Sequence, residues 1–449
     1  MLKLLVERKK LVKLNCAHGI ALVLVLVMAW PGPALAQPPD PQMVAQALLD
    51  NLVAGEFAAA TVHFDDTMSG ALPPAALEQT WVALQQQAGA FQRQLGTSAQ
   101  LVSGHTVVLI TLQFEHMVLD AQIAVSGEGL VSGLYFVPGA VPGYADLDAF
   151  MERAVTVGRD EWALPGLLTL PAGEGPFPAV VLVHGSGPQN RDEAIGPNKP
   201  FRDLAWGLAS KGVAVLRYDK RTLVHGAAMV EAGEFTVDDE TVNDALAAVE
   251  LLRGVEEIDP DRIFALGHSL GGLLAPRIAS RDPGLAGVLI LAGSTRPFTE
   301  VYQAQIEYLL ALDTSLSEEE RVRLLDETAR LVEATRAVVP STDPATLLFG
   351  APPSYWLDLN AYDPVGVAQT IARPMLILQG ERDYQVTLAD FQGWQDGLAG
   401  REEVTFKLYL QLNHLFISGQ GPITPAEYEL PGHVAAEVIE DIARWILAY

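Results

Sequence analysis

The residues best suited to chemistry lie in the turn at residues 267–271, whose sequence Gly-His-Ser-Leu-Gly follows the pattern G-x-S-x-G. An apolar run precedes this turn and a helix-like run follows it, which is the context in which the pattern exposes a serine hydroxyl at a strained bend. Glycine is needed at 267 and 271, because larger side chains would collide with neighbouring backbone. A serine hydroxyl is a poor nucleophile without a base. We therefore predict that Ser269 is the nucleophile of an acyl-transfer reaction.

His414 is the histidine best placed to be that base. In this arrangement the acid and then the histidine follow the serine along the chain, and only His414 and His433 follow Ser269. His414 lies just beyond the apolar run Val404–Leu410, at the C-terminal end of an expected strand, where ligand sites lie. His433 is expected to open the last helix at the surface, so it is the weaker alternative.

The acid should follow the preceding strand, which we expect at Met375–Leu378. Asp383 lies far enough beyond that strand for its carboxylate to turn back towards the site. Glu381 is the alternative, and Asp390 is a weaker one. An ionised carboxylate would hold His414 in the correct tautomer and stabilise the imidazolium that forms during the reaction.

Acyl transfer also needs hydrogen-bond donors for the oxyanion that develops on the substrate. One expected donor is the backbone N–H of Leu270, directly after the nucleophile. The other should come from the turn after the apolar run Ala179–Val183, where we predict the N–H of Ser186. His184 precedes Ser269 in the chain and is interpreted as a structural residue of this turn, and the polar segment 189–199 could frame the pocket.

These residues need a scaffold, and from residue 150 onwards predicted strands alternate with helices. Most of the strands are continuous apolar runs, as expected of a parallel sheet covered on both faces. The fold class is therefore α/β, a doubly wound and mostly parallel sheet. Thr236 is expected to cap a helix over Val237–Arg253. The predicted strands are Gly166–Leu170, Ala179–Val183, Val213–Tyr218, Ile263–Leu266, Val288–Leu291, Met375–Leu378 and Val404–Leu410.

Between about residues 297 and 373 the alternation stops, and helices are predicted over 301–312, 318–338 and 354–359. A helical insertion between two strands of such a sheet is the usual form of a lid. Its apolar side chains could bind acyl chains or could simply pack the helices together; they are Val301, Tyr302, Ile306, Leu309 and Leu310.

The first half of the chain has a different pattern. Residues 43–93 are predicted to be helical, and strand-like runs follow at 107–112, 122–125 and 130–137. Helices followed by an antiparallel sheet predict a small α+β domain over residues 37–140, joined to a catalytic domain over 150–449 by a linker rich in proline and glycine. No metal is expected, because the histidines of this half lack metal-ligand spacing; they are His63, His105 and His116.

Residues 1–36 have the form of an export signal: a basic start, an apolar run over Gly19–Trp30 and the sequence Ala-Leu-Ala at 34–36. The apolar run is short for a membrane span, which needs about 20 residues. We predict cleavage after Ala36 and a periplasmic or extracellular protein, with an uncleaved anchor as the alternative.

The composition excludes several classes of protein. A chain of 449 residues with 49% apolar and 19% charged residues can form large cores and is not disordered. A formal charge of −26 repels phosphate backbones, so no nucleic-acid partner is expected. The single cysteine, Cys16, lies in the predicted signal. The remaining chain therefore has no disulfide, cysteine–zinc site or cysteine nucleophile.

With these residues in view, the chain resembles the serine α/β-hydrolases, and among them exported bacterial carboxylesterases that carry an additional N-terminal domain. The resemblance spans about residues 150–449 and rests on segments 184–193, 195–204 and 215–222 together with the turn around Ser269. It implies the triad Ser269, Asp383 and His414 and activity on short acyl esters. For the expected reaction we predict no cofactor. The N-terminal half is similar to a small domain of unknown function that precedes such hydrolases, and it implies no activity.

A serine at this turn excludes relatives with other nucleophiles, namely the dehalogenases and epoxide hydrolases, which use aspartate, and the dienelactone hydrolases, which use cysteine. We expect a serine carboxylesterase for short-to-medium acyl esters. A peptidase of the prolyl-oligopeptidase type usually carries a β-propeller, for which residues 37–150 are too few, and an exported thioesterase would meet little acyl-CoA. In a different class, a catalytically silent binding protein is the alternative, but silent relatives usually lack a triad member.

Overall fold

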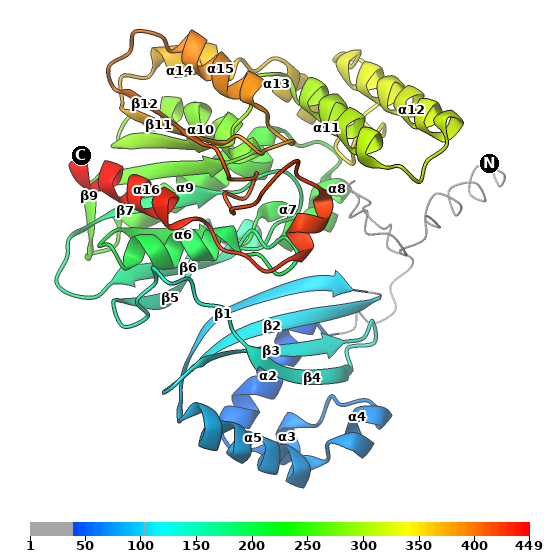
Figure 1. The fold of residues 1–449 in the computed structure, drawn as a ribbon, viewed down its shortest axis with the longest axis vertical. Coiled ribbons are helices and arrows are strands. Elements are labelled where there is room, and N and C mark those ends of the chain that lie inside the picture. The colour runs from blue at the N-terminus through cyan, green and yellow to red at the C-terminus, as the bar shows by residue number, and fades with distance from the viewer. Residues whose placement is uncertain (1–38, 103) are drawn as a thin grey trace. The chain divides into compact units, whose positions relative to one another are not determined.

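The computed structural model describes residues 39–102 and 104–449, so the predicted signal peptide and Cys16 lie outside the described residues. The described chain divides into two compact units, and the boundary in the sequence falls between Asp146 and Leu147 (Figure 1). Each unit has its own hydrophobic core. The two units are described in turn.

The first unit is a small α+β domain, as expected. Its sheet is antiparallel, with neighbouring strands in the order β1-β2-β3-β4. Strand β3 alternates half-buried and buried residues, which is the period expected of a sheet with one face in a core. The elements are α2 (Pro41–Val53), α3 (Phe57–Ala60), α4 (Asp66–Ala71), α5 (Pro74–Ala88), β1 (Phe91–Val102), β2 (His105–Phe114), β3 (Val118–Val125) and β4 (Val131–Pro138).

The second unit is built on an eight-stranded sheet with the order β12-β11-β10-β9-β7-β8-β6-β5. The strands from β12 across to β8 pair in parallel, and β5 and β6 are antiparallel. This confirms the predicted fold class. The strands are β5 (Phe150–Val157), β6 (Leu164–Pro171), β7 (Phe177–Val183), β8 (Ala214–Tyr218), β9 (Ile258–His268), β10 (Gly287–Leu291), β11 (Met375–Gly380) and β12 (Val404–Tyr409).

Helices cover both faces of this sheet. Val181 and Val183 of β7 point into the core that includes residues of α9 (Asn243–Arg253) and α10 (Leu270–Arg281). On the opposite face, α6 (Pro200–Ala209) contacts α16 (Ala436–Ala448). Strands covered on both faces are apolar throughout, which is why the central strands could be predicted from continuous apolar runs. Short helices α7 (Arg221–Val224) and α8 (Gly226–Ala232) follow β8.

One strand was missed and one predicted helix cap was wrong. Strand β5 was not predicted, because it lies at the sheet edge and several of its side chains are exposed. The helix predicted over Val237–Arg253 is present; it begins as a π-helical turn at Asp238–Val242 and continues as α9. Thr236 does not cap it, because the Thr236 N–H and hydroxyl both donate to the carboxylate of Asp239.

The insertion between β10 and β11 is helical, as predicted. It contains α11 (Phe298–Leu312), α12 (Glu318–Arg336), α13 (Pro353–Asn360) and α14 (Pro364–Thr370), the last of which was not anticipated. Helices α11 and α12 pack side by side (Figure 1). After β11 the chain forms α15 (Leu388–Gly397) before entering β12. Within the described residues, no helix has the length and apolarity needed to cross a membrane.

Candidate active site

Ser269 occupies the bend between β9 and α10. Its backbone lies at φ 54° and ψ −115°, a strained conformation for a residue with a side chain. The Ser269 N–H donates to the Leu291 carbonyl at 2.9 Å, which ties the bend to the neighbouring strand β10. A Cβ at Gly267 would collide with the carbonyl oxygen of Gly271, and one at Gly271 would collide with that of Val183. The glycines of the motif are therefore a steric requirement of this turn.

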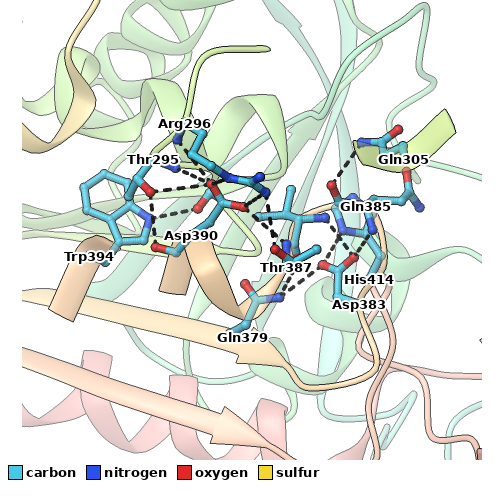
Figure 2. Close-up of polar contacts among 12 residues, drawn as sticks. Thr295, Arg296, Gln305, Gln379, Asp383, Gln385, Thr387, Asp390, Trp394 and His414 are labelled. Atoms are coloured by element: carbon cyan, nitrogen blue, oxygen red, sulfur yellow. Dashed lines mark hydrogen bonds and ion pairs between the residues drawn. The ribbon is translucent and has the colours of Figure 1, made fainter. Parts of the chain in front are cut away.

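Asp383 and His414 form a buried pair beside this bend. The Nδ1 atom of His414 lies 2.7 Å from Oδ2 of Asp383, and the histidine and the aspartate are only 3% and 5% exposed (Figure 2). The other carboxylate oxygen accepts the backbone N–H groups of Gln385 at 2.8 Å and Val386 at 3.0 Å. The carboxylate is thus held by its own loop and faces the histidine.

This contact determines the orientation of the histidine ring. A carboxylate only accepts, so Nδ1 of His414 carries the proton and Nε2 is the nitrogen available to act as a base. Ser269 and His414 both line one cavity of about 220 Å³. Among the described residues, no hydrogen bond joins the two side chains. Such bonds are often long before substrate binds, so the arrangement is compatible with a base and its nucleophile.

The turn after β7 also lines the cavity, through Gly185, Ser186 and Gly187. The N–H of Gly185 is engaged by Oε1 of Glu193 at 2.6 Å, and the Gly185 carbonyl accepts from Nζ of Lys220 at 2.8 Å. The N–H groups of Ser186 and Leu270 make no hydrogen bond within residues 39–102 and 104–449, and both residues line the cavity. Both predicted oxyanion donors are therefore available at the site.

The alternative acids occupy other roles. Glu381 is exposed. Asp390 is fully buried and forms an ion pair with Arg296 at 2.7 Å, and its carboxylate also accepts the N–H groups of Thr295 and Arg296 (Figure 2). Asp390 therefore anchors the segment that leads from β10 into the lid.

The alternative histidines are also engaged elsewhere. His433 pairs with Asp203 at 3.0 Å and does not line the cavity. It also precedes α16 by several residues, so the prediction that it opens this helix was wrong. His184 is buried and contacts the Asn190 carbonyl at 3.1 Å, and burial lowers its pKa to about 4. His184 is therefore neutral at pH 7 and structural in its contacts.

The lid supplies an aromatic wall to the cavity. Phe298, Tyr302 and Phe349 line it and contact one another, with ring centroids 4.7 to 6.3 Å apart. Of the five apolar lid residues singled out in the sequence, Val301 and Tyr302 line the cavity, whereas Leu309 packs against a separate apolar cluster.

Two functional candidates were missed in the sequence. His268, the residue before the nucleophile, forms an ion pair with Glu193 at 2.9 Å. No local pattern marks Glu193, because its partner lies in a distant part of the chain.

No group of three His, Cys, Asp or Glu side chains able to hold a metal ion occurs in the described part of the chain.

Comparison with known proteins agrees with this architecture. Residues 180–420 match the model of the alpha/beta hydrolase family, and residues 45–134 match a family of proteins of unknown function (DUF3887). The chain is 39% identical over 404 residues to the esterase EstD of Thermotoga maritima, covering 89% of this chain and 93% of EstD. It therefore belongs to the alpha/beta hydrolase family.

Solved structures with a similar fold include two esterases of low sequence identity. Est1E of Butyrivibrio proteoclasticus is 16% identical with a TM-score of 0.43, covering 66% of this chain and 99% of that one. An esterase of Pyrococcus furiosus is also 16% identical with a TM-score of 0.44, covering 70% of this chain and 97% of that one.

Proposed function

We propose that this chain is an exported serine carboxylesterase that hydrolyses short-to-medium acyl esters through Ser269, His414 and Asp383. The observation that carries the proposal is the buried 2.7 Å contact between His414 and Asp383 on the cavity that Ser269 also lines. The coarser statement, that the chain is a hydrolase of the carboxylesterase type, follows from its family and its identity to EstD.

The proposed reaction has two halves. Ser269 Oγ attacks the ester carbonyl while Nε2 of His414 takes its proton, and Asp383 stabilises the imidazolium that forms. The N–H groups of Ser186 and Leu270 donate to the oxyanion of the tetrahedral intermediate. His414 then protonates the leaving alcohol, and the acyl group remains on Ser269. Water attacks this acyl-enzyme with His414 again acting as base, which releases the acid and restores the serine.

The size and lining of the cavity support the proposed preference for esters with short-to-medium acyl chains. A volume of about 220 Å³ suits a small ester rather than a long lipid chain, and the aromatic wall of Phe298, Tyr302 and Phe349 is apolar. Apolar walls with a few placed polar groups are typical of sites for small molecules.

The test compares the wild-type protein with Ser269→Ala on p-nitrophenyl esters from acetate to palmitate. We expect the variant to lose at least about 10³-fold in kcat, because loss of the nucleophile removes the covalent route. Its melting temperature should stay close to that of the wild type. Unchanged turnover by a folded Ser269→Ala variant would contradict the assignment.

A further inference from the structure

A second buried acid–histidine pair lies next to the proposed triad. His268 directly precedes Ser269, and its Nδ1 atom lies 2.9 Å from Oε2 of Glu193. Glu193 and His268 are 1% and 4% exposed, and both line the same cavity as Ser269. The reaction proposed above uses neither of these side chains.

The two nitrogens of the His268 ring both face acceptors. Nε2 lies 2.9 Å from the backbone carbonyl oxygen of His414, and Nδ1 faces the Glu193 carboxylate. Neither partner can donate to the ring when Glu193 is ionised, so both nitrogens carry protons. Burial opposes this charge, but the nearby charge of Glu193 outweighs burial and raises the pKa of His268. The charge of His268 likewise outweighs burial at Glu193 and lowers the pKa of Glu193.

The pair connects three parts of the site. Glu193 accepts the N–H of Gly185 at 2.6 Å and so holds the turn in which the next N–H, that of Ser186, is left for the oxyanion. His268 donates to the backbone of His414 and is covalently joined to Ser269. Glu193 itself adopts a left-handed backbone conformation, with φ 50°. Strained residues persist where surrounding contacts hold them, and they gather at functional sites.

We propose that Glu193 and His268 are positioning residues, whose ion pair holds Ser186, Ser269 and His414 in their reactive arrangement. This inference rests on the proposed function, because it assigns the pair a role in the same reaction. Neither side chain takes part in a covalent step.

The test is the isosteric variant Glu193→Gln, with His433→Gln as matched control. The introduced amide oxygen can still accept the N–H of Gly185, but the side chain carries no charge to pair with His268. Because small displacements of reacting groups cost up to about 100-fold in rate, we expect kcat to fall about 10- to 100-fold. KM should stay within about threefold of the wild-type value, because the pocket walls are unchanged. The control breaks a comparable pair with Asp203, which lies outside the cavity lining, and should keep the wild-type kcat.

The dependence of kcat on pH distinguishes a positioning role of the Glu193–His268 pair from a role in stability alone. The ionisable groups facing the pair are His184, Asp383 and His414. In the wild type the charge of Glu193 raises the pKa of His268, so the ring keeps its proton to a higher pH than it would without that charge. Without the Glu193 charge, burial lowers the pKa of His268. If the proton on His268 is needed for positioning, kcat of Glu193→Gln should fall on the alkaline side at a lower pH than kcat of the wild type.

A folded Glu193→Gln variant with the wild-type kcat and the wild-type pH profile would overturn the proposal. If this variant does not fold, His268→Gln takes its place, and a kcat equal to that of His433→Gln overturns the proposal. If neither variant folds, the pair serves stability and the proposal is wrong. Turnover of p-nitrophenyl acetate by the wild type in the same assay distinguishes failure of this inference from failure of the proposed function.

Discussion

At the scale of single residues, the proposed acid, Asp383, differs from the other acidic residues of its loop in the hydrogen bonds that its oxygens accept. Asp383 receives two backbone N–H groups, the side-chain amide of Gln379 at 3.2 Å and the His414 ring (Figure 2). Glu381 lies two residues earlier and is exposed. Burial and the histidine contact together therefore single out Asp383.

This difference gives a paired prediction. Asp383→Asn should lower kcat by about 10³- to 10⁴-fold, because an amide cannot stabilise the imidazolium and favours the wrong tautomer of His414. Glu381→Gln changes a carboxylate in the same loop and should leave kcat within about twofold of wild type, as expected of a surface substitution. Steady-state kinetics of both purified variants on p-nitrophenyl acetate measures this. Equal losses in the two variants would contradict the assignment of the acid.

Ser269, Asp383 and His414 could be predicted from the sequence for two reasons. Each follows a strand that is recognisable as an apolar run, and the three occur along the chain in the order serine, acid, histidine. In the structure Ser269 and His414 line one cavity and Asp383 contacts His414, and the catalytic roles of the three residues stay predictions. Glu193 could not be found in this way. It lies in a polar loop, and its partner His268 is brought to it only by the packing of β7 against β9.

At the scale of elements, the bend between β9 and α10 depends on close backbone approach. We expect Gly267→Ala to lower the free energy of unfolding by about 3 kcal/mol or more, because its Cβ has no space beside the Gly271 carbonyl. Gly226→Ala is the matched control, since a Cβ there meets no atom within 4 Å. Chemical denaturation of both variants measures the difference. A Gly267→Ala protein as stable as the control would refute this account of the turn.

The lid helix α11 is predicted to set the acyl-chain preference. Its Gln305 donates to the Gln385 carbonyl at 3.0 Å, beside the loop that carries Asp383 (Figure 2). Tyr302 lies on the same helix and forms part of the aromatic wall. Tyr302→Ala should raise kcat/KM for octanoate relative to acetate by about tenfold, because it frees space for a longer chain.

The control for this prediction is Glu307→Ala, which removes an exposed side chain from the same helix. It should keep the wild-type ratio of octanoate to acetate. Chain-length profiles on p-nitrophenyl esters measure both variants. An unchanged ratio in Tyr302→Ala would show that the aromatic wall does not limit the acyl chain.

The elements themselves were predicted to different extents. The central strands are apolar on both faces, so β7, β10 and β11 stand out in the sequence. The edge strand β5 does not, because its alternation is broken by exposed and half-buried positions. The helix over residues 237–253 was predicted, but no residue pattern anticipated the π-helical geometry of its first turn at Asp238–Val242.

At the scale of the whole molecule, the chain combines a hydrolase unit with a second unit that has its own core. The length, the apolar content and the charge of −26 made a folded, two-domain protein without nucleic-acid partners the expectation from composition. Composition could not locate the division between the units, which depends on contacts. The match of residues 45–134 to a family of unknown function assigns the first unit no activity.

For the whole molecule we predict export with removal of residues 1–36. When the full chain is expressed in a bacterium, we expect the protein outside the cytoplasm with Gln37 as its first residue, because the Ala-Leu-Ala sequence at 34–36 fits a signal-peptidase site. Cell fractionation and N-terminal sequencing measure this. Replacing Ala36 by a bulky residue should block processing, and a mature protein that retains residues 1–36 would contradict the prediction.

The central claim, that Ser269 carries the acyl group, is tested most directly by trapping the intermediate. The enzyme is quenched with acid during turnover of p-nitrophenyl acetate, and its peptides are analysed by mass spectrometry. The account predicts one acetyl group on the peptide containing Ser269 and none in the Ser269→Ala variant. Rapid turnover with no acetyl group on Ser269, or with the acetyl group on another residue, would contradict it.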